Sequence, residues 1–398
     1  MKICESDIRY QENCPCCGGE MQVIVELPRF PLTGIYVPST EVEFPVQFDQ
    51  RLIICSSCGH MALFNALPPT MLYGPQNVYR TSASHISNDA SEVFINFVRR
   101  VSSDRRFRCV LEIGCNDLYL LKKFESMSER RVGIDPMWSH AEPPETDILV
   151  LGEYLENIDY REALPDAPDL IISTHNLEHI YDPLAELRRL VDVAANDAFF
   201  VMEVPDADSM IRNLRFDQVY HEHYHNFSLP SFLALIDELG CRYIDHTRNY
   251  MNWGGTLLVA FGKSEGAHRE VSPPIVDPIR ADNVITLYNL FRQRMDSLSY
   301  MLGHYGQPIW GYGAGQMLPM LAYHLDSDLD FLEGLIDDNP DRAGLYYPHL
   351  KPKIFSSDDV PSLAESTILI TAQDAARPIL RNLDTINPRR IICPLNAF

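Results

Sequence analysis

The sequence lacks a long apolar run of the kind that crosses a bilayer. A membrane-spanning helix needs about 20 consecutive apolar residues, and no stretch of the 398 residues has that character. The first residues, MKICESDIRYQENCPCC, also lack the apolar core of a signal peptide. We therefore expect a cytoplasmic protein with no membrane partner.

The sequence is also poor in positive charge. It has 33 Lys and Arg against 55 Asp and Glu, which gives a net charge of −22. Binding along a nucleic-acid backbone requires clustered Lys and Arg, so this composition disfavours a nucleic-acid partner. A local group of arginines can still bind one anionic ligand, and the candidates for contact with a diphosphate are Arg80, Arg212, Arg215 and Arg342. The alternative is that each of them is an ordinary surface arginine.

The ten cysteines are too thinly spread over the chain for a disulfide framework. Four of them instead form two CxxC pairs, each followed by glycine: Cys14 with Cys17, and Cys55 with Cys58. Four thiolates fill the tetrahedral coordination of Zn²⁺ and leave no open position, so the pairs predict a structural zinc site. The alternatives are that Cys16 replaces one ligand, or that the four cysteines are unrelated.

The sequence divides into three segments. Residues 1–75 contain both CxxC pairs and short strand-like runs, and we expect a zinc-binding module. In residues 76–263 short apolar runs alternate with helical patterns, which is typical of a doubly wound, mostly parallel sheet. Residues 264–398 begin with a long helical pattern and then repeat the alternation on a smaller scale. The predicted fold class is α/β, with a smaller α/β domain at the C-terminal end.

A glycine turn follows an apolar run in VLEIGCNDLYLL. Glu112 lies near the end of the run, Gly114 lies in the turn, and Asp135 ends the next run. In Rossmann-type sheets this loop crosses the ligand, and an acid in the second position hydrogen-bonds ribose hydroxyls. One glycine stands where a dinucleotide site uses three, which suits S-adenosylmethionine because that cofactor has no phosphate. The alternative is a tight first turn with no cofactor.

The stretch NLEHIYDP, Asn176 to Pro183, follows a later apolar run. Side chains in that place commonly line the open end of a cofactor site. The alternative is a helix start, with Asp182 as N-cap and Pro183 as the first helical residue. Both interpretations can hold together.

The stretch VYHEHYHNFS places His221, His223 and His225 at alternate positions, with Glu222 between the first two. In a strand the three histidines would share one face and could bind a metal ion. The alternative is an acid–base site, because histidine accepts a proton near neutral pH. Spacing alone leaves both open.

Taken in order, these motifs resemble one family along nearly the whole chain. They are the two CxxC pairs, EIGCND at Glu112–Asp117, LEHIYDP at Leu177–Pro183, MEVPD at Met202–Asp206, VYHEH at Val219–His223, GYGAG at Gly311–Gly315 and DDNP at Asp337–Pro340. The resemblance is to sugar C-methyltransferases that act on nucleotide-linked 4-keto-deoxysugars. It implies a class I methyltransferase core with a zinc-binding N-terminal module and a C-terminal Rossmann-like domain.

The resemblance also implies the cofactors, partners and site. S-adenosylmethionine would donate the methyl group, a nucleotide-diphosphate sugar would accept it, and the protein would be a monomer or homodimer. His223 would be the general base, beside Tyr220, Glu222 and an upstream tyrosine that we align with Tyr79. We expect the cofactor to be bound by Glu112, Gly114, Asn116, Asp117, Asp135, His175, Asn176 and His179.

The chain departs from this pattern in three places. Leu118 stands where the family has glycine, and a leucine would be strained if the loop needs a positive φ there. GYGAGQMLPM and TAQDAARPIL also differ from the family's C-terminal motifs, so the acceptor can differ too. Two alternatives follow: a methyltransferase acting on oxygen or nitrogen, and a binding protein with a degenerate methyltransferase fold.

Overall fold

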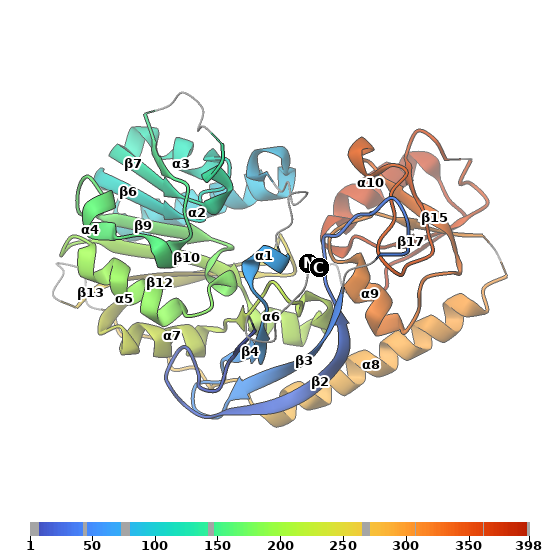
Figure 1. Ribbon diagram of the computed structural model, residues 1–398, viewed down its shortest axis with the longest axis horizontal. Coiled ribbons are helices and arrows are strands. Elements are labelled where there is room, and N and C mark those ends of the chain that lie inside the picture. The colour runs from blue at the N-terminus through green and yellow to red at the C-terminus, as the bar shows by residue number, and fades with distance from the viewer. Residues whose placement is uncertain are drawn as a thin grey trace.

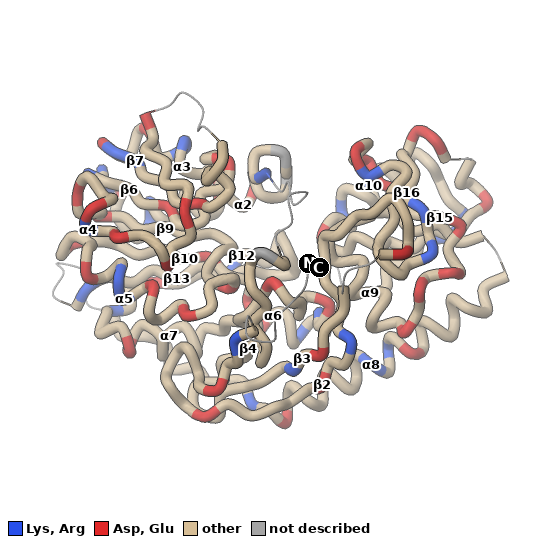
Figure 2. The backbone as a smooth tube through the Cα atoms, viewed as in Figure 1, with Lys and Arg blue, Asp and Glu red and all other residues tan. Residues whose placement is uncertain are grey.

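The computed structural model describes residues 8–42, 46–72, 80–141, 147–264, 271–306, 308–360 and 362–395. Figure 1 shows two lobes, with the N-terminal strands β2 and β3 running beneath and between them. In Figure 2 Asp and Glu positions are spread over both lobes, so the negative charge is not confined to one domain. Within the described ranges, no helix combines the length and the apolar character that a membrane crossing requires.

The larger lobe contains a seven-stranded sheet in the order β12-β13-β10-β9-β6-β7-β8. The strands are β6 (Phe107–Ile113), β7 (Ser128–Ile134), β8 (Leu149–Leu151), β9 (Leu170–Thr174), β10 (Phe199–Pro205), β12 (Cys241–Asn249) and β13 (Thr256–Lys263). β13 pairs antiparallel with both neighbours, and the other pairings are parallel. The predicted doubly wound sheet is confirmed, and its strand order reverses direction between β6 and β9. That switch point is where open α/β sheets form a ligand crevice.

Helices cover both faces of this sheet. They are α2 (His85–Ser102), α3 (Tyr119–Lys123), α4 (Tyr160–Ala163), α5 (Pro183–Val193), α6 (Ala207–Arg212) and α7 (Leu229–Glu238), with short 3-10 turns η2 (Thr81–Ala83), η3 (Glu125–Met127), η4 (Pro136–Trp138), η5 (Leu155–Asn157), η6 (Leu177–His179) and η7 (Phe216–Gln218). α5 begins as the sequence predicts: the Asp182 carboxylate accepts a hydrogen bond from the amide of Ala185 at 3.0 Å, and Pro183 is the first helical residue. The capped-helix interpretation is therefore confirmed.

The N-terminal segment forms a separate antiparallel sheet in the order β11-β4-β3-β2, beside a two-stranded pair of β1 and β5. Its elements are β1 (Arg9–Tyr10), β2 (Met21–Pro31), β3 (Gln47–Cys55), β4 (Met61–Leu63), β5 (Asn65–Ala66) and α1 (Pro69–Leu72). The fourth strand, β11 (His225–Asn226), belongs to the histidine-rich stretch and pairs with β4. The N-terminal module is thus joined by backbone hydrogen bonds to the segment predicted to carry the base.

The smaller lobe is a parallel five-stranded sheet in the order β16-β15-β14-β17-β18. Its elements are α8 (Ala281–Gly303), β14 (Ile309–Tyr312), α9 (Leu318–Leu325), β15 (Leu332–Asp337), η8 (Pro340–Arg342), β16 (Ile354–Ser356), β17 (Thr367–Ile370), η9 (Gln373–Ala375), α10 (Ala376–Ile386) and β18 (Arg390–Ile392). The long helix α8 runs along the base of this lobe toward the larger one (Figure 1).

One apolar cluster joins the three parts of the chain. It includes Leu27 of β2, Met210 of α6, Phe291 of α8 and Leu321 of α9. The sheets lie within the predicted segments 1–75, 76–263 and 264–398, except for β11, but the buried core is not divided at those limits. Burial of such shared apolar surface is the main force that fixes the lobes against each other.

Candidate active site

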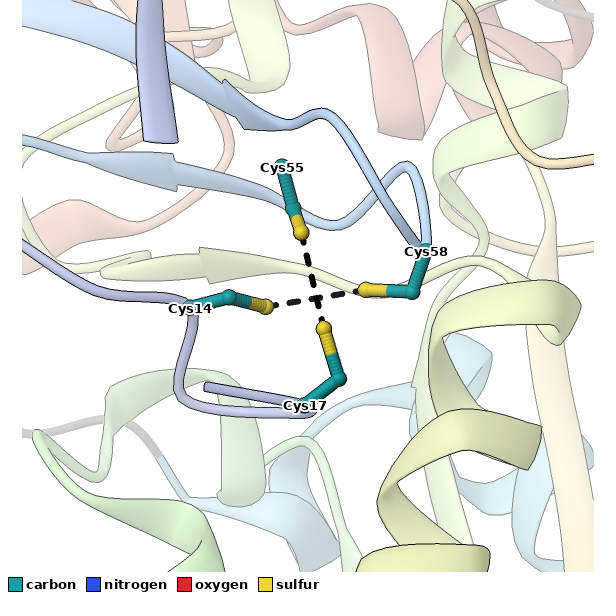
Figure 3. A group of neighbouring side chains, drawn as sticks. All are labelled: Cys14, Cys17, Cys55 and Cys58. Atoms are coloured by element: carbon teal, nitrogen blue, oxygen red, sulfur yellow. Dashed lines mark hydrogen bonds between the residues drawn. The ribbon is translucent and has the colours of Figure 1, made fainter. Parts of the chain in front are cut away.

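Two turns of the N-terminal sheet bring four cysteines together (Figure 3). Cys14 and Cys17 come from the loop before β2, and Cys55 and Cys58 come from the turn between β3 and β4. The four Sγ atoms lie within 4.8 Å of one another, with distances of 3.6 Å between Cys14 and Cys58 and 3.5 Å between Cys17 and Cys55. A tetrahedron with Zn–S bonds of about 2.3 Å has sulfur atoms about 3.8 Å apart. The four predicted ligands therefore fit a zinc ion.

The two cysteine turns form the same hydrogen bond between a backbone amide and a cysteine sulfur. The amide of Cys16 donates to Sγ of Cys14, and the amide of Ser57 donates to Sγ of Cys55, each at 3.4 Å. Such amides stabilise thiolate, which is the form that binds metal. Cys16 contributes this amide and is not one of the four clustered thiols. The interpretation of Cys16 as a rival ligand is not favoured.

The loop after β6 lies at the carboxyl edge of the seven-stranded sheet. Gly114 has a φ of +73°, and a Cβ atom there would lie 2.6 Å from the side chain of Asn176. Asn176 follows β9, which pairs with β6 at the switch point. These two predicted cofactor residues are therefore close neighbours at the switch point of the sheet, where open α/β sheets bind ligands.

Asp135, at the end of β7, holds this loop in place. Its Oδ2 accepts a hydrogen bond from the amide of Asn116 and its Oδ1 accepts one from the amide of Met137, both at 2.9 Å. Burial raises the pKa of Asp135 above its ordinary value, against the lowering effect of these amides and of Arg80. Each carboxylate oxygen has a further lone pair, so a ribose hydroxyl can still donate to it.

Asn116 and Asp117 connect the loop to the segment before α2. Oδ1 of Asn116 accepts from the amide of Thr81 at 3.1 Å, and Oδ2 of Asp117 accepts from the amide of Ser82 at 3.0 Å and from its hydroxyl at 2.5 Å. Tyr79, two residues before Thr81, lies outside the described residues, and its place in the site stays a prediction.

Several buried polar atoms at this edge lack a hydrogen-bond partner within the described part of the chain. They are Oε2 of Glu112, Oδ1 of Asn176 and Nε2 of His175. Burial, together with Asp135 and Asp117, raises the pKa of Glu112 well above its ordinary value. Orphaned buried polar atoms are costly and call for a partner. A polar cofactor in the crevice would supply one, so the residues fit S-adenosylmethionine.

Leu118 adopts a left-handed conformation, which glycine adopts most readily. Its φ is +67° and its ψ is 13°, at the start of α3. A left-handed conformation costs a residue with a Cβ atom about 1–2 kcal/mol. The side chain is fully buried in an apolar cluster with Val110 and Leu121, and this packing offsets the strain.

The three alternate histidines point to three different places. Nε2 of His221 lies 3.0 Å from the carbonyl of Phe30 in β2. Nδ1 of His225 lies 3.2 Å from Nε2 of His60, beside the second cysteine turn. His223 contacts neither of these groups and lies in a separate cluster. The three-histidine metal site is therefore wrong, because a loop, not one straight strand, carries the stretch.

His223 belongs to a cluster that surrounds the carboxylate of Glu178. Oε1 of Glu178 lies 3.5 Å from Nδ1 of His175, 3.9 Å from Nε2 of His179 and 4.0 Å from Nε2 of His223. Nε2 of His223 also shares a 2.6 Å hydrogen bond with the hydroxyl of Tyr220. The sequence suggested His175, His179, His223 and Tyr220, but Glu178 was missed. The only sequence feature that pointed to Glu178 was its place in LEHIYDP, and that motif is equally consistent with the start of a helix.

The charges in this cluster follow from burial and from Glu178. Burial alone would raise the pKa of Glu178, but the neighbouring histidines together have the larger effect and lower this pKa to about 2. Burial alone would lower the pKa of His175, but the effect of Glu178 is larger, and the pKa of His175 is raised above its ordinary value. Burial and its histidine neighbours lower the pKa of His223 to about 3, and burial lowers that of His179. The cluster therefore holds an ionised Glu178, paired with His175, and a neutral His223.

Glu178, His179 and His223 offer ligand atoms within 4.8 Å of one another, a distance that a cation could bridge. Nε2 of His223 is already bonded to Tyr220, and Glu178 already faces His175 as its counter-ion. The arrangement accordingly favours proton chemistry over metal binding.

The carboxylate of Glu222 does not contact His223. Oε1 accepts from the hydroxyl of Thr33 at 2.9 Å and Oε2 accepts from the amide of Gln316 at 2.7 Å. Its backbone carbonyl lies 2.7 Å from Nδ1 of His179. Glu222 thus connects the VYHEH stretch to the N-terminal module and to the C-terminal domain, and its carboxylate does not lie where it could orient the His223 imidazole directly.

The candidate diphosphate arginines have different surroundings. Arg215 is only 1% exposed and pairs with Asp217 at 2.8 Å and with Asp374 of the smaller lobe at 2.9 Å. It is therefore not a surface arginine, and its guanidinium holds the lobes together. Arg342 pairs with Asp337 at 3.2 Å, and Arg212 is exposed.

Comparison with known proteins agrees with this geometry. Residues 86–246 match a family model described as a methyltransferase domain. C-methyltransferase NovU of Streptomyces niveus is 26% identical over 280 residues, which cover 68% of this chain and 65% of NovU. The match thus spans just under two thirds of the length of that relative.

Two solved structures are similar to part of this chain. N-methyltransferase NodS of Bradyrhizobium japonicum WM9, in complex with S-adenosylhomocysteine, is 13% identical, with a TM-score of 0.35, over 46% of this chain and 89% of NodS. The 1,6-didemethyltoxoflavin-N1-methyltransferase of Burkholderia thailandensis is 15% identical, with a TM-score of 0.35, over 46% of this chain and 80% of that one. The family match and the observed strand order lead to one conclusion: residues 86–246 of this chain form a methyltransferase domain of the class I fold.

Proposed function

We propose that this protein is an S-adenosylmethionine-dependent C-methyltransferase. Its acceptor is a nucleotide-linked deoxysugar, and the methyl group is added to a carbon next to the keto group. The observation that carries this proposal is the 2.6 Å hydrogen bond between the Tyr220 hydroxyl and Nε2 of a buried, neutral His223. The match to NovU, which is a C-methyltransferase, supports transfer to carbon.

The cofactor would lie across the switch point between β6 and β9. Asp135 would accept hydrogen bonds from the ribose hydroxyls, and Glu112 and Asn176 would contact the polar methionine end through their orphaned oxygens. When bound, S-adenosylmethionine supplies an electrophilic methyl group on sulfur. The segment from His175 to His179 runs from this crevice to the Glu178 cluster, so the methyl group and the base can meet.

The base is required because carbon is a poor nucleophile until a proton next to the carbonyl is removed. That proton moves to a ring nitrogen of His223, and the electron pair of the C–H bond becomes the enolate. The resulting imidazolium carries N–H on both nitrogens, so its Nε2–H donates to the Tyr220 oxygen. The Tyr220 proton is then directed at the enolate oxygen, which it stabilises. Burial keeps the pKa of Tyr220 well above its ordinary value, so this hydroxyl stays protonated.

The other two domains hold this site in shape. Four thiolates fit a structural zinc ion, and β4, which follows them, pairs with β11 two residues beyond His223. Glu222 brings Gln316 of the C-terminal domain to the same stretch. We infer that the C-terminal domain shapes the sugar-nucleotide pocket, with Arg80 and Arg212 as the remaining candidates for diphosphate contact and Tyr79 as a further pocket residue.

The test is to incubate the full chain with S-adenosylmethionine and a panel of nucleotide-linked 4-keto-deoxysugars, and to analyse the products by mass spectrometry and NMR. We expect one sugar to gain a carbon-bound methyl group, and His223→Ala to lose this activity while S-adenosylhomocysteine still binds by calorimetry. A methyl group found on oxygen or nitrogen, or full turnover in His223→Ala, would contradict the proposal.

A further inference from the structure

The carboxylate of Glu178 is in an unusual environment. Its side chain is fully buried, and neither carboxylate oxygen has a hydrogen-bond partner within the described residues. An ionised carboxylate taken out of water is strongly destabilising unless positive charge or donors lie near it. The groups nearest to Oε1 are three imidazoles, from His175, His179 and His223, at 3.5 to 4.0 Å.

The rings of His179 and His223 are each oriented by a partner other than Glu178. Nδ1 of His179 lies 2.7 Å from the carbonyl of Glu222, and Nε2 of His223 is bonded to Tyr220 at 2.6 Å. The distance of 4.0 Å between Glu178 and His223 is too long for a hydrogen bond but short for two charges. Glu178 can therefore act on His223 through its charge, but not through a direct hydrogen bond.

We propose that Glu178 is a positioning residue for the proton: its buried negative charge stabilises the imidazolium that forms on His223 when this base takes the substrate proton. The inference rests on the proposed function, because it assigns the counter-charge of that proton transfer. The step conserves charge and atoms. One proton leaves the substrate carbon, the C–H electron pair remains as the enolate, and the positive charge on His223 faces the negative charge on Glu178.

The other charged groups around the cluster leave this role to Glu178. Glu203 in β10 accepts from the hydroxyl of Thr256 at 2.6 Å, and burial raises its pKa, so it is the more readily protonated carboxyl. Asp374 of the smaller lobe pairs with Arg215. His175 and His179 lie on the same segment as Glu178, and Glu178 raises the pKa of His175 against the lowering effect of burial. Within the described ranges, Glu178 is therefore the carboxylate that lies within 4.0 Å of the charge formed at His223.

The experiment compares Glu178→Gln with wild type in the full chain, with no ligand added. Nitrogen-15 NMR of the histidine side chains follows the titration of His223, which His223→Asn identifies by the loss of its signal. Removing the charge should lower the pKa of His223 by about 1 or more. Glu186→Gln is the matched control, because Glu186 is also buried but pairs with Arg189 in α5, and it should leave the His223 titration unchanged.

A second readout uses the methyl acceptor found among the 4-keto sugars. Glu178→Gln should lower kcat by about 10²-fold or more, with KM little changed, because the lost interaction exists only after proton transfer. Glu178→Asp keeps the charge and should recover part of the rate. This variant also separates a charge effect from misfolding if Glu178→Gln does not fold.

The outcomes separate the two proposals. An unchanged His223 titration in Glu178→Gln overturns the inference whatever the activity. A lowered pKa of His223, with no methyl transfer by wild type to any sugar, supports the charge coupling and counts against the proposed function. A second metal ion per chain beyond the one expected at the four cysteines, lost in Glu178→Gln, would also overturn it, because the cluster would then be a metal site.

Discussion

The chain contains two Rossmann-like sheets whose first loops can be compared residue by residue. In the larger lobe β6 leads to Gly114, and Asp135 directly follows β7. In the smaller lobe β14 leads to Gly313 and β15 ends at Asp337. Both glycines have positive φ, +73° and +100°, and each lies against the residue that follows the next strand across the switch point.

The hydrogen bonds of the two aspartates are also alike. Oδ2 of Asp135 accepts from the loop amide of Asn116 at 2.9 Å, and Oδ2 of Asp337 accepts from the loop amide of Ala314 at 2.7 Å. In both cases Oδ1 accepts from the amide two residues after the aspartate, at 2.9 Å. The same loop-and-acid device thus occurs twice in one chain.

The difference lies in what surrounds the second loop. Arg342 binds Asp337 and donates to the carbonyl of Ala314 at 3.1 Å, while the Tyr36 hydroxyl donates to the same carbonyl at 2.9 Å. Tyr347 donates to the carbonyl of the next residue. Beside the first loop, Glu112, Asn176 and His175 each keep an orphaned polar atom, whereas beside the second only Oε1 of Gln373 is orphaned among the described residues. Topology alone therefore does not identify a cofactor site: the two loops share a backbone arrangement but differ in how many polar groups beside them still need a partner.

The largest expected effect concerns the N-terminal module, which contacts both sheets. Cys58→Ser, or removal of metal by a chelator, should destabilise the chain by several kcal/mol, because a zinc ion bound by the four cysteines would join both turns, and because β2 packs in the shared core. Metal content by mass spectrometry and thermal unfolding provide the measurement, with Cys241→Ser as a control that keeps its metal. Metal-free protein with the wild-type melting temperature would contradict this.

The second prediction separates the two aspartates. Asp135→Asn should raise the Kd for S-adenosylhomocysteine about 10- to 100-fold, because it removes a charged acceptor for ribose. Asp337→Asn should leave that Kd unchanged and lower the melting temperature, since Arg342 loses its carboxylate. Calorimetry and thermal unfolding of both variants test this. Equal losses of affinity would remove the distinction between the loops.

The third prediction uses Glu222, which links the second loop to the VYHEH stretch. Burial raises its pKa from 4.5 to about 7, against the hydrogen bonds from Thr33 and Gln316. Between these values the folded chain keeps a proton that the unfolded chain loses, so wild-type stability falls as the pH rises. Glu222→Gln should remove this loss and be more stable than wild type at pH 8 by up to about 3 kcal/mol.

The measurement for Glu222 is urea unfolding of both proteins at pH 5 and pH 8. The difference between variant and wild type should be larger at pH 8 than at pH 5. If the difference is the same at both pH values, the carboxyl does not titrate in this interval.

The smallest expected effect concerns Leu118, where the first loop departs from the family. Leu118→Gly should relieve about 1 kcal/mol of left-handed strain but lose a buried leucine worth about 3 kcal/mol. The net result is a loss of about 2 kcal/mol in chemical unfolding, with S-adenosylhomocysteine affinity unchanged. A gain in affinity would mean that the leucine obstructs the first crevice.

Local patterns predicted much of this structure. The CxxC pairs, the Gly114 turn, the acid at Asp135 and the Asp182 cap each depend on neighbouring residues, and the structure has each of them. The positive φ at Leu118 was also anticipated as the condition under which leucine is strained. Such features can be predicted from sequence because backbone geometry restricts which residue types can occupy them.

Contacts between distant segments were not predictable in this way. The two-residue strand β11 has no period of its own, and only its pairing with β4 defines it. The burial of Arg215 depends on Asp374 of the other lobe, and the contacts of Glu222 depend on Thr33 and Gln316. Glu178 was missed because its histidine neighbours come together only when the YHEH loop folds onto η6.

The most direct test of the central claim is NMR of the product formed with S-adenosylmethionine labelled with carbon-13 on the methyl group. The acceptor is a nucleotide-linked 4-keto-deoxysugar. The account predicts a labelled methyl bonded to the carbon next to the keto group in wild type, and no such product in His223→Ala. A label on oxygen or nitrogen, or the same product from His223→Ala, would contradict it.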